Sequence, residues 1–324
     1  MRQRILGVSA NVFFLGVISL LNDMSSEMIF TLLPLFLANV LGTAPAIIGL
    51  IEGIAESTAS LLRIGSGWFS DKIGRRKLLA FSGYALSTIV KPVMYLATAW
   101  STVLGVRFAD RVGKGIRSAP RDALIADSLE KHERGKGFGF HRAMDTAGAM
   151  LGIATGALII YLVQQNSLLL ERATYQTLVI VGVVPAVISL FIFLFVREAR
   201  RMTTGQSAPA TGPVSRAPLG RRFWSYIGIV FLFTLGNSSD AFLVLRAQDL
   251  GNSALTIMLM LIIFNAVYAG LSVPFGVLSD RLGRRGVIII GWLVFAAVRL
   301  GFTGATASWH VWLLFAAWGL YYAL

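Results

Sequence analysis

Long apolar runs, separated by short polar segments, fill nearly the whole chain. A helix needs about 20 apolar residues to cross the hydrocarbon core of a bilayer, and windows of that length recur ten times. The pattern predicts an all-α polytopic membrane protein whose first helix is kinked at Pro34. The ten predicted helices span residues 8–40, 45–69, 78–99, 102–127, 138–162, 174–196, 223–247, 254–278, 286–305 and 308–324.

Basic residues gather in alternate loops between these runs. Loops rich in Lys and Arg face the cytoplasm, which predicts a multi-pass protein of the inner (plasma) membrane with a cytoplasmic N-terminus. The apolar run behind Arg2 and Arg4 is too long for a signal peptide. The later basic loops contain Lys72, Arg75, Arg76 and Lys77; Lys131, Arg134 and Lys136; Arg197, Arg200, Arg201, Arg216, Arg221 and Arg222; and Arg281, Arg284 and Arg285.

One polar stretch divides the chain in two. Residues 197–222 are basic and rich in Gly, Pro, Ser and Ala, a composition typical of a flexible linker. It predicts an N-terminal half of six helices, residues 1–196, a cytoplasmic linker, and a C-terminal half, residues 223–324.

A ten-residue motif occurs once in each half. GWFSDKIGRR at 67–76 recurs as GVLSDRLGRR at 276–285, and Ser25-Ser26-Glu27 is echoed by Ser238-Ser239-Asp240. Six predicted helices, an even number, separate the two copies, so both lie on one membrane face and the halves are parallel repeats. The shared positions are Gly67, Asp71, Gly74, Arg75 and Arg76, and Gly276, Asp280, Gly283, Arg284 and Arg285.

Composition excludes several classes of protein. Hydrophobic residues make up 56% of the chain and charged residues 14%, against about 25% charged in soluble proteins, so a soluble enzyme is excluded. The net charge of +13 lies in the loops and does not indicate nucleic-acid binding. With no cysteine and three histidines, neither a metal nor another cofactor is predicted. No nucleophile–base pair indicates a catalytic residue, so the chain is not predicted to be an enzyme.

The repeated motif resembles motif A of the major facilitator superfamily, and RVGKGIRSA at 111–119 is similar to that family's helix-4 motif. The resemblance implies two parallel six-helix halves and secondary transport by alternating access, with the repeated motif as a conformational latch whose Asp71 meets helix 11. The family's usual twelve helices imply that this chain is C-terminally truncated, with an incomplete second half. The 324 residues are therefore not expected to transport a substrate on their own.

One departure concerns helix 5. Antiporters of the family often have a Gly-Pro pair there, whereas this chain has Gly148, Gly152 and Gly156 without the proline. Small residues four apart favour close helix packing.

Charged residues inside the predicted helices mark the candidate site. A charge near the bilayer centre costs at least about 2.5–3.5 kcal/mol, so these groups must pair or face water. Asp23 and Glu27 share one face of helix 1, and intramembrane acids of this kind are proton relays by default. The predicted proton-coupling acids are Asp23, Glu27 and Asp240. The predicted substrate-binding residues, grouped around the expected central axis, are Asn22, Ser26, Arg111, Lys114, Asn237 and Ser239.

Each group also has a structural interpretation. Glu27 or Asp23 with Arg111 is equally consistent with a plain ion pair. Glu52 and Glu56 on helix 2 favour a structural role beside the cavity. Lys91 and Arg299 are expected to snorkel or to pair within their own half.

The leading prediction is proton-coupled efflux of small organic compounds by a monomer in the lipid bilayer. The alternatives are proton-coupled uptake of an organic anion or phosphorylated metabolite, and a non-transporting sensor or scaffold on the same fold. Helix 4 carries a stripe of basic residues at three- and four-residue spacing, namely Arg107, Arg111, Lys114, Arg117 and Arg121. This stripe supports an anionic substrate unless the chain's own acids neutralise it. The sequence has no Walker A motif, so ATP is not the expected energy source.

Overall fold

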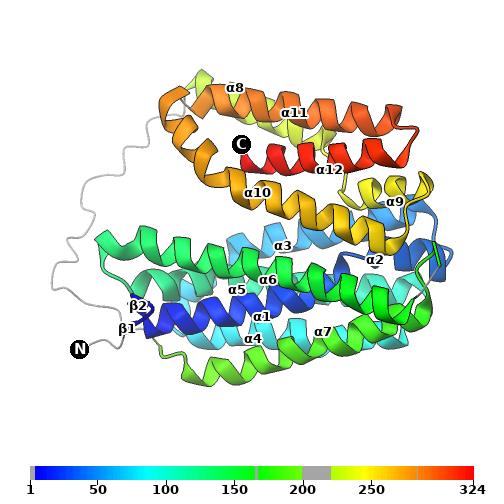
Figure 1. The fold of residues 1–324 in the computed structure, drawn as a ribbon. Coiled ribbons are helices and arrows are strands. Elements are labelled where there is room, and N and C mark those ends of the chain that lie inside the picture. Colours follow the sequence, from blue (N-terminus) through cyan, green and yellow to red (C-terminus); the bar gives the residue numbers. More distant parts are fainter. Residues whose placement is uncertain (1–3, 165–166, 199–219, 283) are drawn as a thin grey trace.

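The computed structural model describes residues 4–164, 167–198, 220–282 and 284–324, without the side chains of 131, 222, 273, 276, 277, 279–282 and 284. Helices run side by side along one axis (Figure 1). The N-terminal group contains α1 (Ala10–Phe30), α2 (Leu33–Leu35), α3 (Pro45–Ile73), α4 (Arg76–Val90), α5 (Trp100–Asp127), α6 (Arg134–Val163) and α7 (Arg172–Ile192). The C-terminal group contains α8 (Arg221–Gly236), α9 (Ala241–Asp249), α10 (Ala254–Leu282), α11 (Arg284–Gly304) and α12 (Ser308–Ala323).

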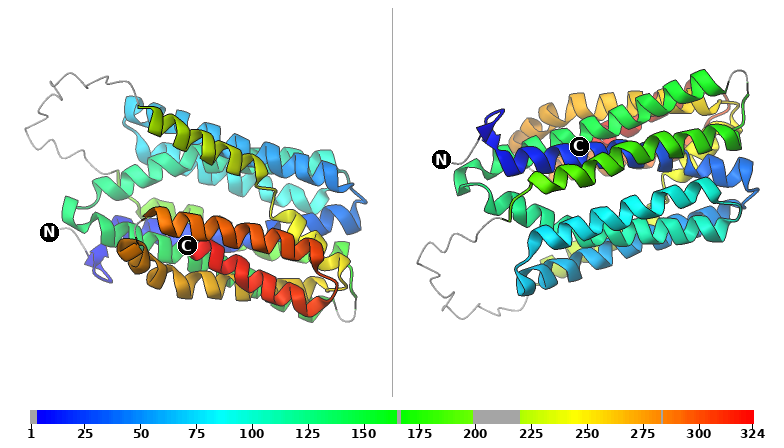
Figure 2. Two further views of the ribbon diagram at one scale, coloured as in Figure 1. Left: turned by 90° about the horizontal axis from the view of Figure 1, so that it is seen from above. Right: turned by 90° about the horizontal axis from the view of Figure 1, so that it is seen from below.

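Short elements complete the described chain. Two-residue strands β1 (Arg4–Ile5) and β2 (Val8–Ser9) pair antiparallel ahead of α1. A π-helix follows α2, and 3-10 turns follow α4, α5 and α7; these are Phe36–Val40, Lys91–Leu96, Lys131–Glu133 and Phe193–Phe195. The hairpin and residues 198 and 220, which flank the undescribed part of the predicted linker, lie at the same end of the bundle, called the linker end below (Figure 2).

The predicted all-α membrane architecture is confirmed. Within the described residues, eight helical segments are long and apolar enough to cross a bilayer. Two predicted spans are not among them. α12 has only 16 residues. α5, with 28 residues, is long enough to cross the bilayer, but it contains many charged side chains.

Two predicted spans are interrupted. In the first, α1 ends at Phe30 and Pro34 lies in the short α2, which agrees with the predicted kink. The seventh was expected to be continuous over 223–247, but α8 ends at Gly236 and α9 begins at Ala241. Asn, Ser and Asp side chains compete for backbone hydrogen bonds and disfavour helix interiors, and the four residues at 237–240 are of these types.

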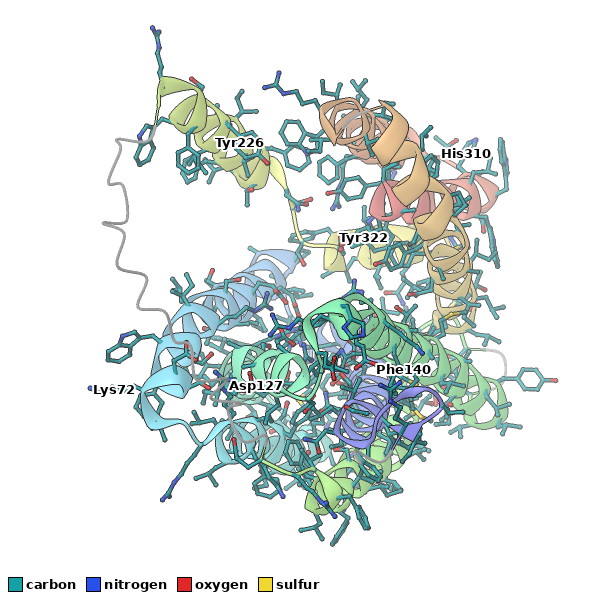
Figure 3. The ribbon with its side chains drawn as sticks, turned by 90° about the vertical axis from the view of Figure 1, so that its left-hand side faces the viewer. Lys72, Asp127, Phe140, Tyr226, His310 and Tyr322 are labelled. Atoms are coloured by element: carbon teal, nitrogen blue, oxygen red, sulfur yellow. The ribbon has the colours of Figure 1, made fainter. Side chains whose placement is uncertain are left out.

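The helices pack as two groups that touch along limited surfaces. In the first group α1 lies against α6 and α7, and α5 lies against α3 and α4; in the second, α12 lies against α10 and α11. Figure 3, viewed from the linker end, separates the groups, with Phe140 in the first and Tyr226 in the second. Between them, α6 contacts α10, and α9 contacts α2 and α3.

Glycines allow α6 to approach α1 closely. A Cβ atom added at Gly148 would lie 2.3 Å from the backbone oxygen of Leu20, and one at Gly152 would lie 2.5 Å from that of Met24. Because these contacts are with backbone atoms, the helices would have to separate to admit a side chain.

We therefore expect Gly152→Ala to lower the thermal unfolding midpoint of the purified protein by several degrees. Gly139→Ala on the same helix is the matched control, because nothing lies within 4 Å of its added Cβ atom. Alanine is favoured over glycine in a helix, so this control should leave the midpoint unchanged or raise it. Equal midpoints for both variants would contradict the close packing of α1 and α6.

Candidate functional site

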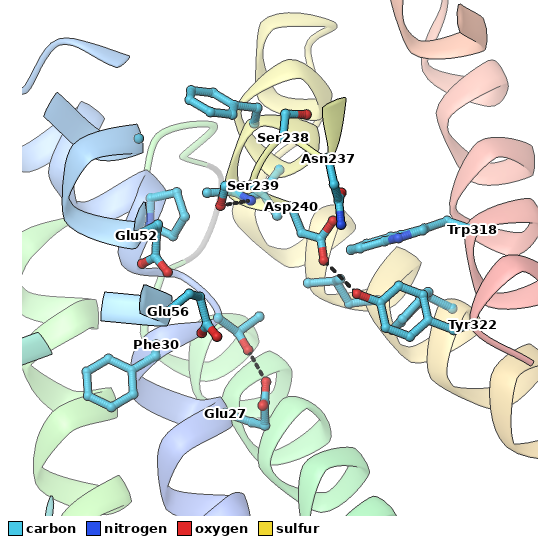
Figure 4. Close-up of a pocket in the computed structure, with 18 of the residues that line it drawn as sticks. Glu27, Phe30, Glu52, Glu56, Asn237, Ser238, Ser239, Asp240, Trp318 and Tyr322 are labelled. Carbon is cyan, nitrogen blue, oxygen red and sulfur yellow. Dashed lines mark hydrogen bonds between the residues drawn. The ribbon is translucent and has the colours of Figure 1, made fainter. Parts of the chain in front are cut away.

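A cavity of about 810 Å³ lies between the two groups of helices. Its lining includes four carboxylates, from Glu27, Glu52, Glu56 and Asp240, and one guanidinium, from Arg107. Figure 4 shows Glu27, Glu52 and Glu56 facing Asp240 and Tyr322 across the cavity. This space is called the acidic cavity below.

Two of the carboxylates form ion pairs with α5. Arg107 donates to Glu52 from Nε (3.2 Å) and from Nη2 (2.6 Å), and their side chains are only 5% and 11% exposed. The Arg107 guanidinium also lies over the Phe30 ring, 4.6 Å from its centroid. One turn along, Arg111 pairs with Glu56 at 3.2 Å. Charges spaced by one helical turn on α3 therefore match those on α5.

Glu27 differs from the other carboxylates of the acidic cavity. It accepts a hydrogen bond from the Thr31 hydroxyl at 2.5 Å. Among the described residues, no Lys, Arg or His nitrogen lies within 4.0 Å of its carboxylate. It is half-buried at the middle of the first span, where an acid without a cationic partner is expensive to keep ionised.

The break between α8 and α9 forms the opposite wall. Asn237, Ser238, Ser239 and Asp240 all line the acidic cavity. Asp240 accepts hydrogen bonds from Arg299 and from the Tyr322 hydroxyl, both at 2.9 Å. Arg299 also donates to the backbone oxygen of Ser238 at 3.0 Å. The broken helix thus presents polar side chains at the cavity, and Arg299 binds both the Asp240 carboxylate and the Ser238 carbonyl.

The two halves repeat one polar contact. In the first half, the Lys91 ammonium donates to the hydroxyls of Ser25 and Ser26 at 2.9 and 3.0 Å, and Lys91 is fully buried. In the second, Arg299 contacts the corresponding segment at Ser238 and Asp240. The sequence carries a signal for this correspondence, since Lys91 follows Asp71 by 20 residues and Arg299 follows Asp280 by 19.

A second compartment, of about 360 Å³, adjoins the acidic cavity on the side of the linker end. Ala149 and Asn265 line both spaces. This basic compartment is lined by five cationic and three anionic side chains, namely Arg63, Lys114, Arg117, Arg121 and Arg142, and Asp23, Asp122 and Asp145. Arg142 also donates to the Tyr268 hydroxyl at 2.9 Å, which joins α6 to α10.

The predicted coupling and binding residues are divided among several places. Glu27, Asp240, Asn237 and Ser239 line the acidic cavity, whereas Asp23 and Lys114 line the basic compartment. Arg111 is held by Glu56, Ser26 by Lys91, and both amide atoms of Asn22 are buried without a partner among the described residues.

Several cavity residues were assigned differently from sequence or not at all. Glu52 and Glu56, expected beside the cavity, line it, because α3 turns this face inward. Asn265 was not selected, although a lone amide within an apolar run was its available signal. Trp318, whose aromatic ring within an apolar run is more typical of packing or of the membrane interface, lines the cavity beside Phe264 at a ring distance of 4.3 Å.

The first copy of the repeated motif forms contacts at the linker end. Gly74 ends α3 with a φ of 68°, a left-handed conformation that favours glycine. Arg76 pairs with Asp71 at 3.0 Å and also with Asp127. The Glu198 carboxylate accepts from the backbone N–H groups of Arg76 and Lys77 at 3.0 and 2.9 Å.

Other positions of the motif contribute less. Gly67 faces Ala119, with 3.5 Å between its added Cβ atom and the alanine methyl, Arg75 precedes α4, and Arg285 is exposed in α11. In the second copy, Gly276, Asp280, Gly283 and Arg284 lie outside the residues whose side chains are described.

Known proteins provide a sequence comparison. The family model for the Major Facilitator Superfamily matches residues 15–245. An uncharacterised MFS-type transporter of Methanocaldococcus jannaschii is 37% identical over 323 residues, which cover 98% of this chain and 78% of that protein.

Solved structures provide a comparison of the fold. A bacterial homologue of the human lysosomal transporter Spinster, in an inward-facing and unoccupied conformation, aligns with 96% of this chain and 73% of its own, at a TM-score of 0.69 and 19% identity. A nucleoside transporter aligns with 97% of this chain and 80% of its own, at a TM-score of 0.72 and 14% identity.

Proposed function

The chain belongs to the Major Facilitator Superfamily of secondary transporters, and we propose that it exchanges protons for small organic compounds bearing a positive charge. The observation that carries this proposal is Glu27. It is the carboxylate of the acidic cavity that has no cationic partner among the described residues. Such a group can bind either a proton or an organic cation, and competition for one carboxylate couples the two movements.

The predicted helix 4 corresponds to α5, and the ion pairs made by its basic residues favour a cation over an anion in the acidic cavity. Arg107 and Arg111 are neutralised by Glu52 and Glu56, so neither offers a free positive charge there. Asp240 is held by Arg299 and Tyr322; we assign it a supporting role. Asp23, one turn from Glu27, provides a route for the proton towards the linker end.

Access to the cavity changes in this proposal when the two halves rock about the central axis. Asp71, Arg75, Arg76, Asp280, Arg284 and their neighbouring glycines form the conformational latch at the linker end. The basic loops face the cytoplasm by the charge rule, so an inward proton gradient across the cell membrane drives the compound outward.

The test uses everted membrane vesicles that contain the full-length protein. A respiratory substrate acidifies the lumen and quenches a pH-sensitive dye, and organic amines are then added. We expect dye recovery, because protons leave as the amine enters the lumen, and no recovery in the double variant Asp23→Asn with Glu27→Gln. Glu130→Gln, on an exposed side chain, is the matched control and should behave as wild type.

Recovery with organic anions instead of amines would overturn this proposal in favour of anion transport through Lys114. Equal recovery in the double variant would show that neither acid couples the transport. Binding of an amine without any proton movement would support a sensor or scaffold on the same fold.

A further inference from the structure

The acidic cavity and the basic compartment carry opposite charge and are continuous. Ala149 and Asn265 line both. Glu27 of the cavity and Asp23 of the compartment are one turn apart on α1, which is about 6 Å along the helix axis. A compound whose length matches this spacing can therefore reach from one space into the other.

Some charges of the basic compartment are already neutralised. Arg121 donates to Asp122 at 2.9 and 3.0 Å. Asp145 accepts from the Ser19 hydroxyl and lies 3.6 Å from the His141 ring nitrogen. These groups form structural contacts within the N-terminal group.

Two buried or half-buried cations of the compartment, Lys114 and Arg117, have no carboxylate oxygen within 4.0 Å among the described residues. Arg117 is 5% exposed and lies over the Tyr84 ring, 4.5 Å from its centroid, and its Nη1 atom is buried without a hydrogen-bond partner in the described part of the chain. For Lys114, no ion pair joins its ammonium to any described residue. Buried polar groups are normally hydrogen-bonded, so these two donors can receive an anionic group.

The acidic cavity also offers an aromatic surface beside its carboxylates. The Phe264 ring lies 4.3 Å from Trp318 and 5.3 Å from Tyr322, and all three line the cavity. Aromatic faces attract organic cations and apolar rings.

We propose that the two compartments bind one zwitterionic organic compound. Its ammonium group lies in the acidic cavity at Glu27, and its carboxylate or phosphate group lies in the basic compartment at Lys114 and Arg117. This assignment names the substrate class of the transport function proposed above and rests on it. A simple cation would fill only the acidic cavity and leave the Arg117 donor unsatisfied.

The probe is 4-(aminomethyl)benzoate, which carries an ammonium and a carboxylate at opposite ends of a phenyl ring. Benzylamine and benzoate each retain one of these charges on the same ring. Binding to the purified full-length protein is measured by isothermal titration calorimetry. We expect the zwitterion to bind at least about tenfold more tightly than either analogue, because a charge-assisted hydrogen bond contributes this much.

Variants assign the anionic contact to its residue. Lys114→Gln is expected to remove most of the zwitterion's advantage over benzylamine, with the remainder carried by Arg117, and to leave benzylamine binding unchanged. Lys136→Gln is the matched control, because Lys136 binds the backbone oxygen of Gly7 outside both compartments, and it should have no effect on either ligand.

Zwitterion binding no tighter than benzylamine binding, including no measurable binding of either, would overturn the zwitterion assignment. So would equal losses for zwitterion and benzylamine in Lys114→Gln. The vesicle assay distinguishes this failure from failure of the transport proposal. Benzylamine-driven dye recovery that depends on Glu27 would support the proton-exchange proposal even if the zwitterion binds no more tightly than benzylamine.

Discussion

Vesicles that carry Glu27→Gln are expected to show no amine-driven dye recovery, at the level of vesicles without the protein. Glutamine retains the size of the side chain and the contact with Thr31, but it cannot release a proton. The other carboxylates of the acidic cavity cannot replace it, because Arg107, Arg111 and Arg299 hold them. Glu27→Asp keeps the acid and should retain part of the recovery.

The neighbouring acid provides the matched comparison for this prediction. Asp23→Asn removes a carboxylate one turn away, in the basic compartment, and should leave part of the amine-driven recovery in place. The reverse result, full recovery in Glu27→Gln and none in Asp23→Asn, would locate the coupling acid at Asp23.

Arg107→Met is expected to lower the free energy of unfolding by about 3–5 kcal/mol, because it leaves the buried Glu52 carboxylate without its counter-charge. The Glu52 side chain is only 11% exposed and accepts both Arg107 hydrogen bonds. The double variant Glu52→Gln with Arg107→Met removes both charges and should recover most of the loss. Denaturant titration of the detergent-solubilised protein measures each value.

The exposed pair between Arg4 and Glu133 is the matched control for Arg107. Their side chains are 63% and 24% exposed, and an ion pair near water contributes at most about 1 kcal/mol. Arg4→Met should therefore have a small effect. A similar small effect of Arg107→Met would show that Glu52 is not held as a buried anion.

The positions of most helices were predictable because each of these depends on its own residues. An apolar window of about 20 residues specifies a membrane span regardless of its neighbours. The kink near Pro34 is equally local, because proline removes a backbone donor. The break at 237–240 also has a local cause, but a rule based on apolar windows does not register four polar residues within a longer run.

The composition of the site was less predictable because it depends on how each helix is rotated. The face of α3 that carries Glu52 and Glu56 turns towards the cavity, and no pattern within that helix shows which partner it will meet. The division between Glu27 and Asp23 has the same origin. Four residues separate them on α1, yet they line spaces of opposite charge.

The ion pairs between α3 and α5 have a consequence for membrane insertion during synthesis. α5 is long enough to cross the bilayer, but its charged residues leave it less apolar than the eight helical segments that qualify as membrane spans. Its Arg107 and Arg111 meet Glu52 and Glu56, which leave the ribosome earlier and already reside in the bilayer with α3. Entry of α5 from the translocon is then a joint event, in which an inserted helix supplies the counter-charges that the incoming helix lacks.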